Sequence, residues 1–230
     1  MLNKRDLGLG LLVVVIWALN TVAIKFVTNE VEPFTGLAFR LVIASLVFLP
    51  FVRPIARDKF WTLAQITFLI CVLHWASLIW SIERLDASMA AILLQLQVIF
   101  SLLWGFLFFG ERFGIKTGIG ILVGIFGVVI LVGVPETPPP LTGIIGMIFT
   151  TLVLSLGYAR MKGLQGVSPL NYIALTHILS AGPILALAFL FEKPMDMNWN
   201  QINHTNLIGA LVFQVFLVSF SHMLWQRLMS

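Results

Sequence analysis

The sequence predicts an all-α polytopic membrane protein, and three observations support this prediction. The chain of 230 residues contains 59% hydrophobic and only 10% charged residues, and its mean hydropathy is +1.00. Soluble domains carry about 25% charged residues, so this chain has too few charges to cover a water-facing surface. Its apolar residues fall into eight runs of about 20 residues, the length that a helix needs to cross a hydrocarbon core about 30 Å thick.

Each apolar run is expected to be a helix, because a helix satisfies its backbone hydrogen bonds within one segment in lipid. A transmembrane β-barrel would instead need segments of about ten residues with alternating polarity, which the runs lack. The first run follows two basic residues, as in a signal peptide, but it is too long and no clear small-x-small cleavage site follows it. The predicted spans are 8–27, 33–52, 60–82, 86–109, 114–134, 141–160, 169–191 and 206–227.

The basic residues predict the orientation of these spans. With the N-terminus in the cytoplasm, the cytoplasmic joints hold ten of the 14 Lys and Arg residues, and most acidic residues lie on the opposite side. This distribution is typical of the positive-inside rule. The net charge of +4 therefore reflects topology and does not indicate nucleic-acid binding. The single cysteine, Cys71, allows no intramolecular disulfide.

The spacing of the spans indicates an internal repeat. Lys25 ends the first span and Pro33 opens the second, just as Lys162 ends the sixth and Pro169 opens the seventh. The three adjacent prolines before residue 141 cannot continue a helix. The predicted organisation is a five-helix repeat over 1–134, a linker over 135–140, and an incomplete second repeat of three helices over 141–230. An odd number of helices per repeat inverts the second copy.

Several motifs in the first five spans form a recognisable combination. They are Trp17-Ala-Leu-Asn20 with Lys25, Arg40, Leu94-Gln95-Leu96-Gln97, Phe109-Gly110-Glu111-Arg112 and the glycine-rich span Gly118–Gly133. This combination resembles the EamA family of the drug/metabolite transporter superfamily, and most closely its exporters of the O-acetylserine/cysteine type. The resemblance implies ten helices in two inverted repeats around a central cavity, and export of small metabolites. The sequence departs from this pattern because it stops after eight spans and its sixth span lacks the Trp/Asn pair. The expected consequences are association with a second chain that completes the bundle, or a truncated protein inactive alone.

Arg40 is the first candidate for substrate binding. It lies about seven residues, or roughly 10 Å, into the second span. A charge at that depth is costly and indicates a functional site by default. One interpretation is docking of a substrate carboxylate on the planar guanidinium. The other is snorkelling to the outer surface, or pairing with Glu30 or Glu32.

Five further polar or aromatic residues within the spans are predicted to bind substrate: Trp17, Asn20, His74, Gln95 and Gln214. Each also has a structural interpretation, as a hydrogen bond between helices or, for the indole, as a packed or lipid-facing ring. Histidine titrates near physiological pH, so proton coupling is conceivable. Two other histidines within spans, His177 and His222, are weaker candidates.

Some residues are expected to be structural. Glu111 and Arg112 are predicted to form the turn between the fourth and fifth spans. The glycine pairs Gly114/Gly118 and Gly120/Gly124 have the spacing that allows close approach of membrane helices.

Absent motifs narrow the function. No Asp or Glu lies in the core of a span, which disfavours proton-driven export of drug cations. The sequence contains no phosphate-binding loop and no hydrolase or metalloprotease motif. We therefore predict a secondary transporter in the bacterial inner membrane, which exports a small polar metabolite, an amino acid or derivative, by alternating access. An intramembrane enzyme is disfavoured, and no cofactor, metal or nucleic-acid partner is expected; the partners are the solute and the bilayer.

Overall fold

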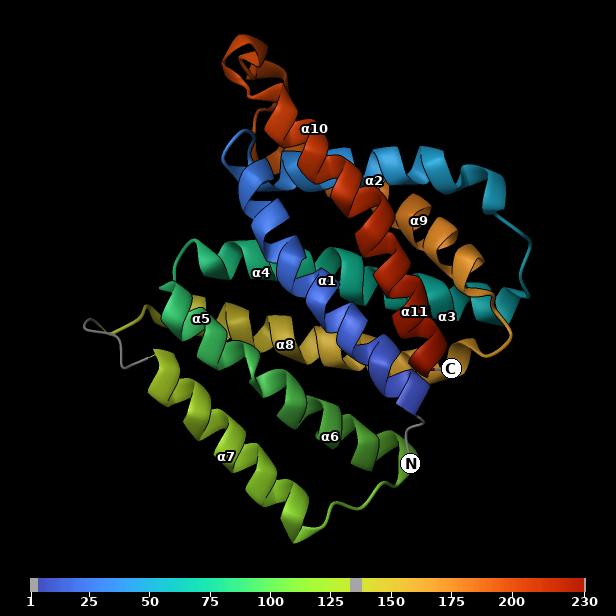
Figure 1. Ribbon diagram of the computed structural model, residues 1–230, viewed down its shortest axis with the longest axis vertical. Coiled ribbons are helices and arrows are strands. Elements are labelled where there is room, and N and C mark those ends of the chain that lie inside the picture. Colours follow the sequence, from blue (N-terminus) through green and yellow to red (C-terminus); the bar gives the residue numbers. More distant parts are fainter. Residues whose placement is uncertain (1–3, 133–137, 230) are drawn as a thin grey trace. The chain divides into compact units, whose positions relative to one another are not determined.

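The computed structural model describes residues 4–132 and 138–229, and it contains only helices and their connections within those ranges (Figure 1). Seven helical segments are long and apolar enough to cross a membrane, and α7 supplies a shorter apolar stretch, Ile115–Gly127. The all-α polytopic prediction is confirmed. The spans are α1 (Lys4–Thr28), α2 (Pro33–Phe48) with η1 (Leu49–Phe51), α3 (Arg57–Thr67) with η2 (Phe68–Leu73) and α4 (His74–Ile82), α5 (Ala87–Leu94) with α6 (Leu96–Phe109), α7 (Ile115–Val132), α8 (Leu141–Met161), α9 (Pro169–Phe191), and α10 (His204–Phe213) with η6 (Gln214–Val218) and α11 (Ser219–Met229). Short 3-10 turns, η3 (Lys162–Leu164), η4 (Pro194–Asp196) and η5 (Trp199–Gln201), lie in the joints.

Large apolar side chains cover the outside of these helices. Leu11 on α1, Leu46 on α2 and Leu190 on α9 are 60%, 67% and 72% exposed. In water such surfaces would aggregate, whereas in a bilayer they face the lipid chains.

Three of the predicted continuous spans are interrupted. The spans α3–α4 and α10–α11 each contain a π-helical segment near the middle, Phe68–Leu73 and Gln214–Val218. Between α5 and α6, the N–H of Gln95 donates to the carbonyl of Ile92 and the N–H of Val98 donates to that of Gln95, so tighter turns replace the α-helical pattern there. Hydropathy alone does not reveal such irregularities, which are often found at functional sites.

The chain forms two compact units, Met1–Ala64 with Met161–Ser230, and Gln65–Arg160. In the first unit, α2 packs against α9, and α1 packs against α10 and α11 (Figure 1). Helices α2 and α9 are antiparallel, and hydrogen bonds join each end of α2 to the opposite end of α9. Glu192 accepts hydrogen bonds from the backbone N–H groups of Phe34 and Thr35, both at 2.7 Å. At the other end, the Asn171 amide bonds to the backbone N–H and carbonyl of Arg53, at 2.9 and 3.0 Å.

These bonds complete the ends of α2. The first N–H groups of a helix have no partner within the helix, and a carboxylate there also interacts favourably with the helix dipole. Glu192 engages two of these groups and the Thr35 hydroxyl. The charge pattern places the start of α2 and the end of α9 on the same side of the membrane, and these two segments are hydrogen-bonded to each other.

We expect Glu192→Ala to destabilise the protein by about 2 kcal/mol, because charge-assisted hydrogen bonds contribute about 1.5–3 kcal/mol each and Glu192 is only half-buried. This corresponds to a decrease in Tm of about 4–8 °C, measurable by thermal unfolding of the purified protein in detergent. Glu83→Ala is the matched control, since Glu83 makes a surface ion pair with Arg84 and such pairs contribute little. Equal Tm values for the two variants would contradict this role of Glu192.

In the second unit, α8 approaches the span α3–α4 through three glycines. A Cβ atom at Gly143, Gly146 or Gly157 would collide with side chains of Leu85, Ser81 or Ile70 respectively. Trp104 on α6 donates to the Ser155 hydroxyl on α8 at 3.0 Å. These small residues and cross-helix hydrogen bonds hold the unit together where lipid provides no hydrophobic driving force.

The glycine pairs of the fifth span do not have the predicted packing role. Apart from adjacent residues and the backbone of the same helix, no atom of the described residues lies within 4 Å of a Cβ built at Gly114, Gly118, Gly120 or Gly124. That prediction was wrong, because spacing shows that glycines share a helix face but not which face meets a neighbour.

The turn after α6 agrees with the structural interpretation of Glu111. Gly110 ends α6 with φ of 64°, a conformation that favours glycine. The N–H of Gly110 donates to the carbonyl of Phe106 at 3.1 Å, as in the αL type of helix cap, and the N–H of Glu111 donates to the carbonyl of Gly105 at 3.2 Å. Of the predicted linker 135–140, residues 135–137 lie outside the described part of the chain.

Candidate functional site

The first unit contains four of the six predicted site residues, and Arg40 is one of them. This residue lies on α2 and is 5% exposed. Its guanidinium is near enough to His177 on α9 and His222 on α11 to interact electrostatically with both. Three basic side chains from three helices therefore share one buried region, while every Asp and Glu of the sequence lies in a joint or at a span end.

His177 is held from two sides. Its Nε2 lies 2.9 Å from the Ser219 hydroxyl, and its ring stacks on Phe48 with centroids 5.7 Å apart. Ser219 directly follows the π-helical segment η6, so this irregular segment sets the position of the histidine's partner. The imidazole is 4% exposed, and its orientation is fixed by both contacts.

Trp17 belongs to a hydrogen-bonded chain that ends at the same segment. Its Nε1 donates to the Ser221 hydroxyl at 2.9 Å, and Ser221 donates to the carbonyl of Val218 at 2.6 Å. The same carbonyl lies 2.8 Å from Nδ1 of His222. The indole also packs against the rings of His222 and Trp225, with centroids 5.6 and 5.4 Å away. Trp17 is thus partly buried and packs against α11.

Asn20 and Gln214 belong to the same unit. Asn20 lies one turn beyond Trp17 on α1 and is 8% exposed, and Gln214 opens η6 and is 3% exposed. The structure therefore places four predicted residues, Trp17, Asn20, Arg40 and Gln214, in the helices that enclose this region.

Several buried polar atoms of this unit lack a hydrogen-bond partner within the described residues: Asn20 Oδ1, Thr176 Oγ1, His177 Nδ1 and Gln226 Oε1. Buried polar groups are normally paired, and an unpaired one costs about 1–3 kcal/mol. Such atoms are therefore places where a ligand or water can bind.

His74 and Gln95 lie in the second unit. His74 Nδ1 is 3.4 Å from the carbonyl of Thr150, whose hydroxyl donates to Ser77 at 2.8 Å. His74 is therefore buried and hydrogen-bonded between helices, which agrees with its structural interpretation. Gln95 is half-buried at the break between α5 and α6.

Sequence reasoning ranked His177 and His222 below His74, whereas the structure brings these two to Arg40. The eighth span contained a weak signal for this site, because three polar residues, Ser219, Ser221 and His222, occur within four positions of an apolar segment. Polar residues three apart face the same side of a helix and can serve one site.

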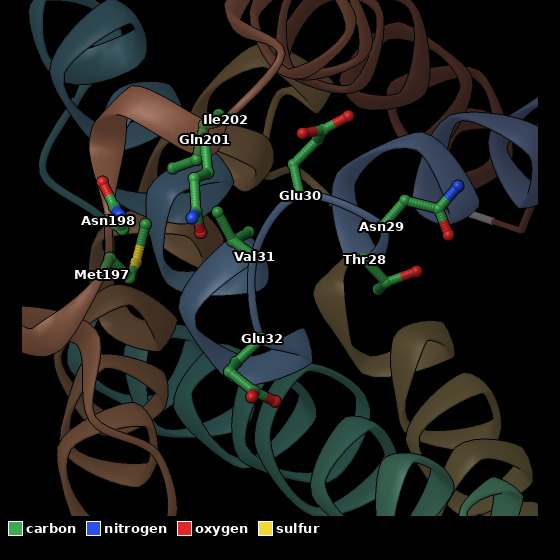
Figure 2. A pocket seen from close by; sticks show the side chains of 9 residues that line it. All are labelled: Thr28, Asn29, Glu30, Val31, Glu32, Met197, Asn198, Gln201 and Ile202. Carbon is green, nitrogen blue, oxygen red and sulfur yellow. The ribbon is translucent and has the colours of Figure 1, made fainter.

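An open cavity of about 470 Å³ lies where α1 ends and α2 begins (Figure 2). Its wall includes the carboxylates of Glu30 and Glu32 and the amides of Asn198 and Gln201. Glu30 is already engaged by the backbone N–H of Asn203 at 2.7 Å. No cluster of three metal-ligating side chains occurs among the residues that the structure describes.

Comparison with known proteins adds a family and a fold. The sequence pattern of the EamA-like transporter family matches residues 6–133. A probable amino-acid metabolite efflux pump of Escherichia coli K12 is 32% identical over 139 residues, which cover 57% of this chain and 44% of that protein. The corresponding protein of Salmonella typhimurium LT2 is 30% identical over the same shares. The chain therefore aligns with less than half the length of these curated relatives.

A solved structure, described only as the crystal structure of a protein, superposes with a TM-score of 0.78 at 16% identity. The match covers 99% of this chain and 80% of that one, and it shows the fold alone.

Proposed function

The chain belongs to the EamA-like transporter family, and from this membership we propose that it is a secondary transporter of the bacterial inner membrane. Its solute is a small metabolite that carries a carboxylate, an amino acid or a derivative, and the direction is export. The efflux-pump names of the two bacterial relatives support this proposal.

The observation that carries the proposal is the burial of Arg40 beside two histidines in a unit whose spans hold no acidic residue in their cores. A guanidinium pairs with a carboxylate in a bidentate geometry, and inside a membrane a buried charge commonly marks a solute pathway. A zwitterionic or anionic solute complements this region better than a cation does.

Alternating access moves one repeat against the other around the bound solute, and points at which a span can bend assist such a movement. The π-helical segments of the third and eighth spans and the break at Gln95 provide such points, because they lack the regular hydrogen bonds that stiffen a helix. The two π-helical segments resemble each other locally. Each ends on a carbonyl, of Leu73 or Val218, that accepts a hydrogen bond from a serine hydroxyl. This similarity supports the inverted repeat, in which the third and eighth spans correspond.

The test is export by the full chain in cells that overproduce it. We expect amino acids or derivatives to accumulate in the medium several-fold above the level of cells with an empty vector, as measured by mass spectrometry of the supernatant. Purified protein in liposomes loaded with the same solutes should release them faster than protein-free liposomes. No accumulation in the medium and no release from liposomes would overturn the proposal.

A further inference from the structure

The imidazole of His177 presents one nitrogen that the protein leaves open. Its Nε2 pairs with the Ser219 hydroxyl at 2.9 Å, whereas its Nδ1 is buried and has no hydrogen-bond partner among the described residues. Stacking on Phe48 fixes the plane of the ring. An open polar atom on a residue that is 96% buried is costly unless something binds there.

In the pair with Ser219, either the hydroxyl or the ring Nε2 can be the donor. When a hydroxyl donates to Nε2 of a neutral imidazole, the other nitrogen, Nδ1, carries the ring hydrogen. His177 then offers an N–H donor to a ligand. His222 cannot do the same with its Nδ1, because that atom already pairs with the carbonyl of Val218 at 2.8 Å.

We propose that His177 is a second carboxylate-binding residue, whose Nδ1–H donates to one oxygen of the carboxylate that Arg40 binds. This inference rests on the proposed function and narrows its substrate class to solutes with a free carboxylate. The charged and titratable groups that act on His177 are Arg40 from α2 and His222 from α11, and both are basic. Neither group carries a negative charge that would repel a carboxylate.

The arrangement also explains specificity. A methyl ester or an amide carries no anionic oxygen, so it would leave the His177 N–H without a charged acceptor. A site that leaves buried donors unpaired rejects the analogue. The protein should thus transport the free acid in preference to its ester.

The experiment measures KM and maximal rate in proteoliposomes that contain the full chain, with an exported amino acid and its methyl ester as probes. We expect His177→Phe and His177→Gln to raise KM for the acid about 10- to 100-fold, the effect of one hydrogen bond to a charged group. The maximal rate should change little, and discrimination against the ester should fall. His177→Asn should retain KM within a few-fold, because its amide nitrogen, like Nδ1, is attached to the γ-carbon.

His204→Phe, at an exposed position, is the matched control. Tm is measured for every variant in detergent. Unchanged KM in the Phe and Gln variants would overturn the inference. An equal rise in KM in all three variants, in proportion to their decreases in Tm, would also overturn it, because that result would indicate a structural role for His177. If the wild-type chain exports no carboxylate at all, the proposed function itself fails.

Discussion

We expect Arg40→Ala to reduce export to the level of cells without the protein, while the amount of protein in the membrane stays the same. Truncating one partner of a buried, hydrogen-bonded charge pair costs about 2–5 kcal/mol, or roughly 30- to several-thousand-fold in affinity. Removal of the Arg40 guanidinium leaves only the imidazoles of His177 and His222, the two groups that interact with it electrostatically, to hold the carboxylate. The measurement is solute export from cells, normalised to membrane protein by quantitative blotting.

Arg40→Lys separates geometry from charge. An ammonium group retains the positive charge but cannot form the two parallel bonds of a guanidinium. We expect export by this variant to be impaired but measurable. Arg57→Ala is the control, because Arg57 is exposed at the start of α3. Full export by Arg40→Ala would remove Arg40 from the binding site, and full export by Arg40→Lys would show that charge alone is sufficient.

The spans could be predicted from the sequence because lipid imposes one strong requirement on every segment that crosses it. Hydropathy placed the second span at 33–52, and the structure has helix from Pro33 to Phe51. The seventh span agrees at both ends, 169–191 against Pro169–Phe191. Boundaries were accurate where prolines and charged residues mark the change from apolar to polar surroundings.

The interior of the spans could not be predicted in the same way. The π-helical segments and the break at Gln95 depend on hydrogen bonds between neighbouring turns, to which the hydropathy pattern is insensitive. The region around Arg40 is assembled from α2, α9 and α11, and His177 lies 137 positions from Arg40 in the sequence. The position of a polar residue within a predicted span indicates that it is buried in the membrane. Only the packing of the helices shows which of these residues share a site.

The glycines show the same limit. Spacing predicted close packing for Gly120 and Gly124, which are open, and gave no such role to Gly157, which is tightly enclosed. Both kinds of glycine have similar apolar sequence surroundings, so their roles are distinguished only by the neighbouring helix.

Gly157→Leu is therefore expected to disrupt the second unit. A Cβ at this position would overlap Cγ1 of Ile70 and would lie 3.5 Å from Cβ of Leu69, both in the π-helical segment of the third span. These atoms are near the backbone and cannot move aside without shifting the helix. Overpacking costs about 1–3 kcal/mol or more, so we expect Tm to fall by about 5 °C or more and the yield of folded protein in detergent to drop several-fold.

Gly120→Leu on α7 is the matched control for Gly157→Leu. It makes the same substitution at a glycine that no neighbouring helix encloses, so a difference between the two variants reports packing. Apart from adjacent residues and the backbone of α7, no described atom lies within 4 Å of a Cβ there, and leucine favours a helix over glycine by nearly 1 kcal/mol. This variant should be as stable as the wild type or slightly more stable, when Tm and monodispersity are compared by size-exclusion chromatography after heating. If Gly157→Leu behaves like Gly120→Leu, then α8 does not contact the π-helical segment closely. The third span would in that case be free to bend there without displacing α8.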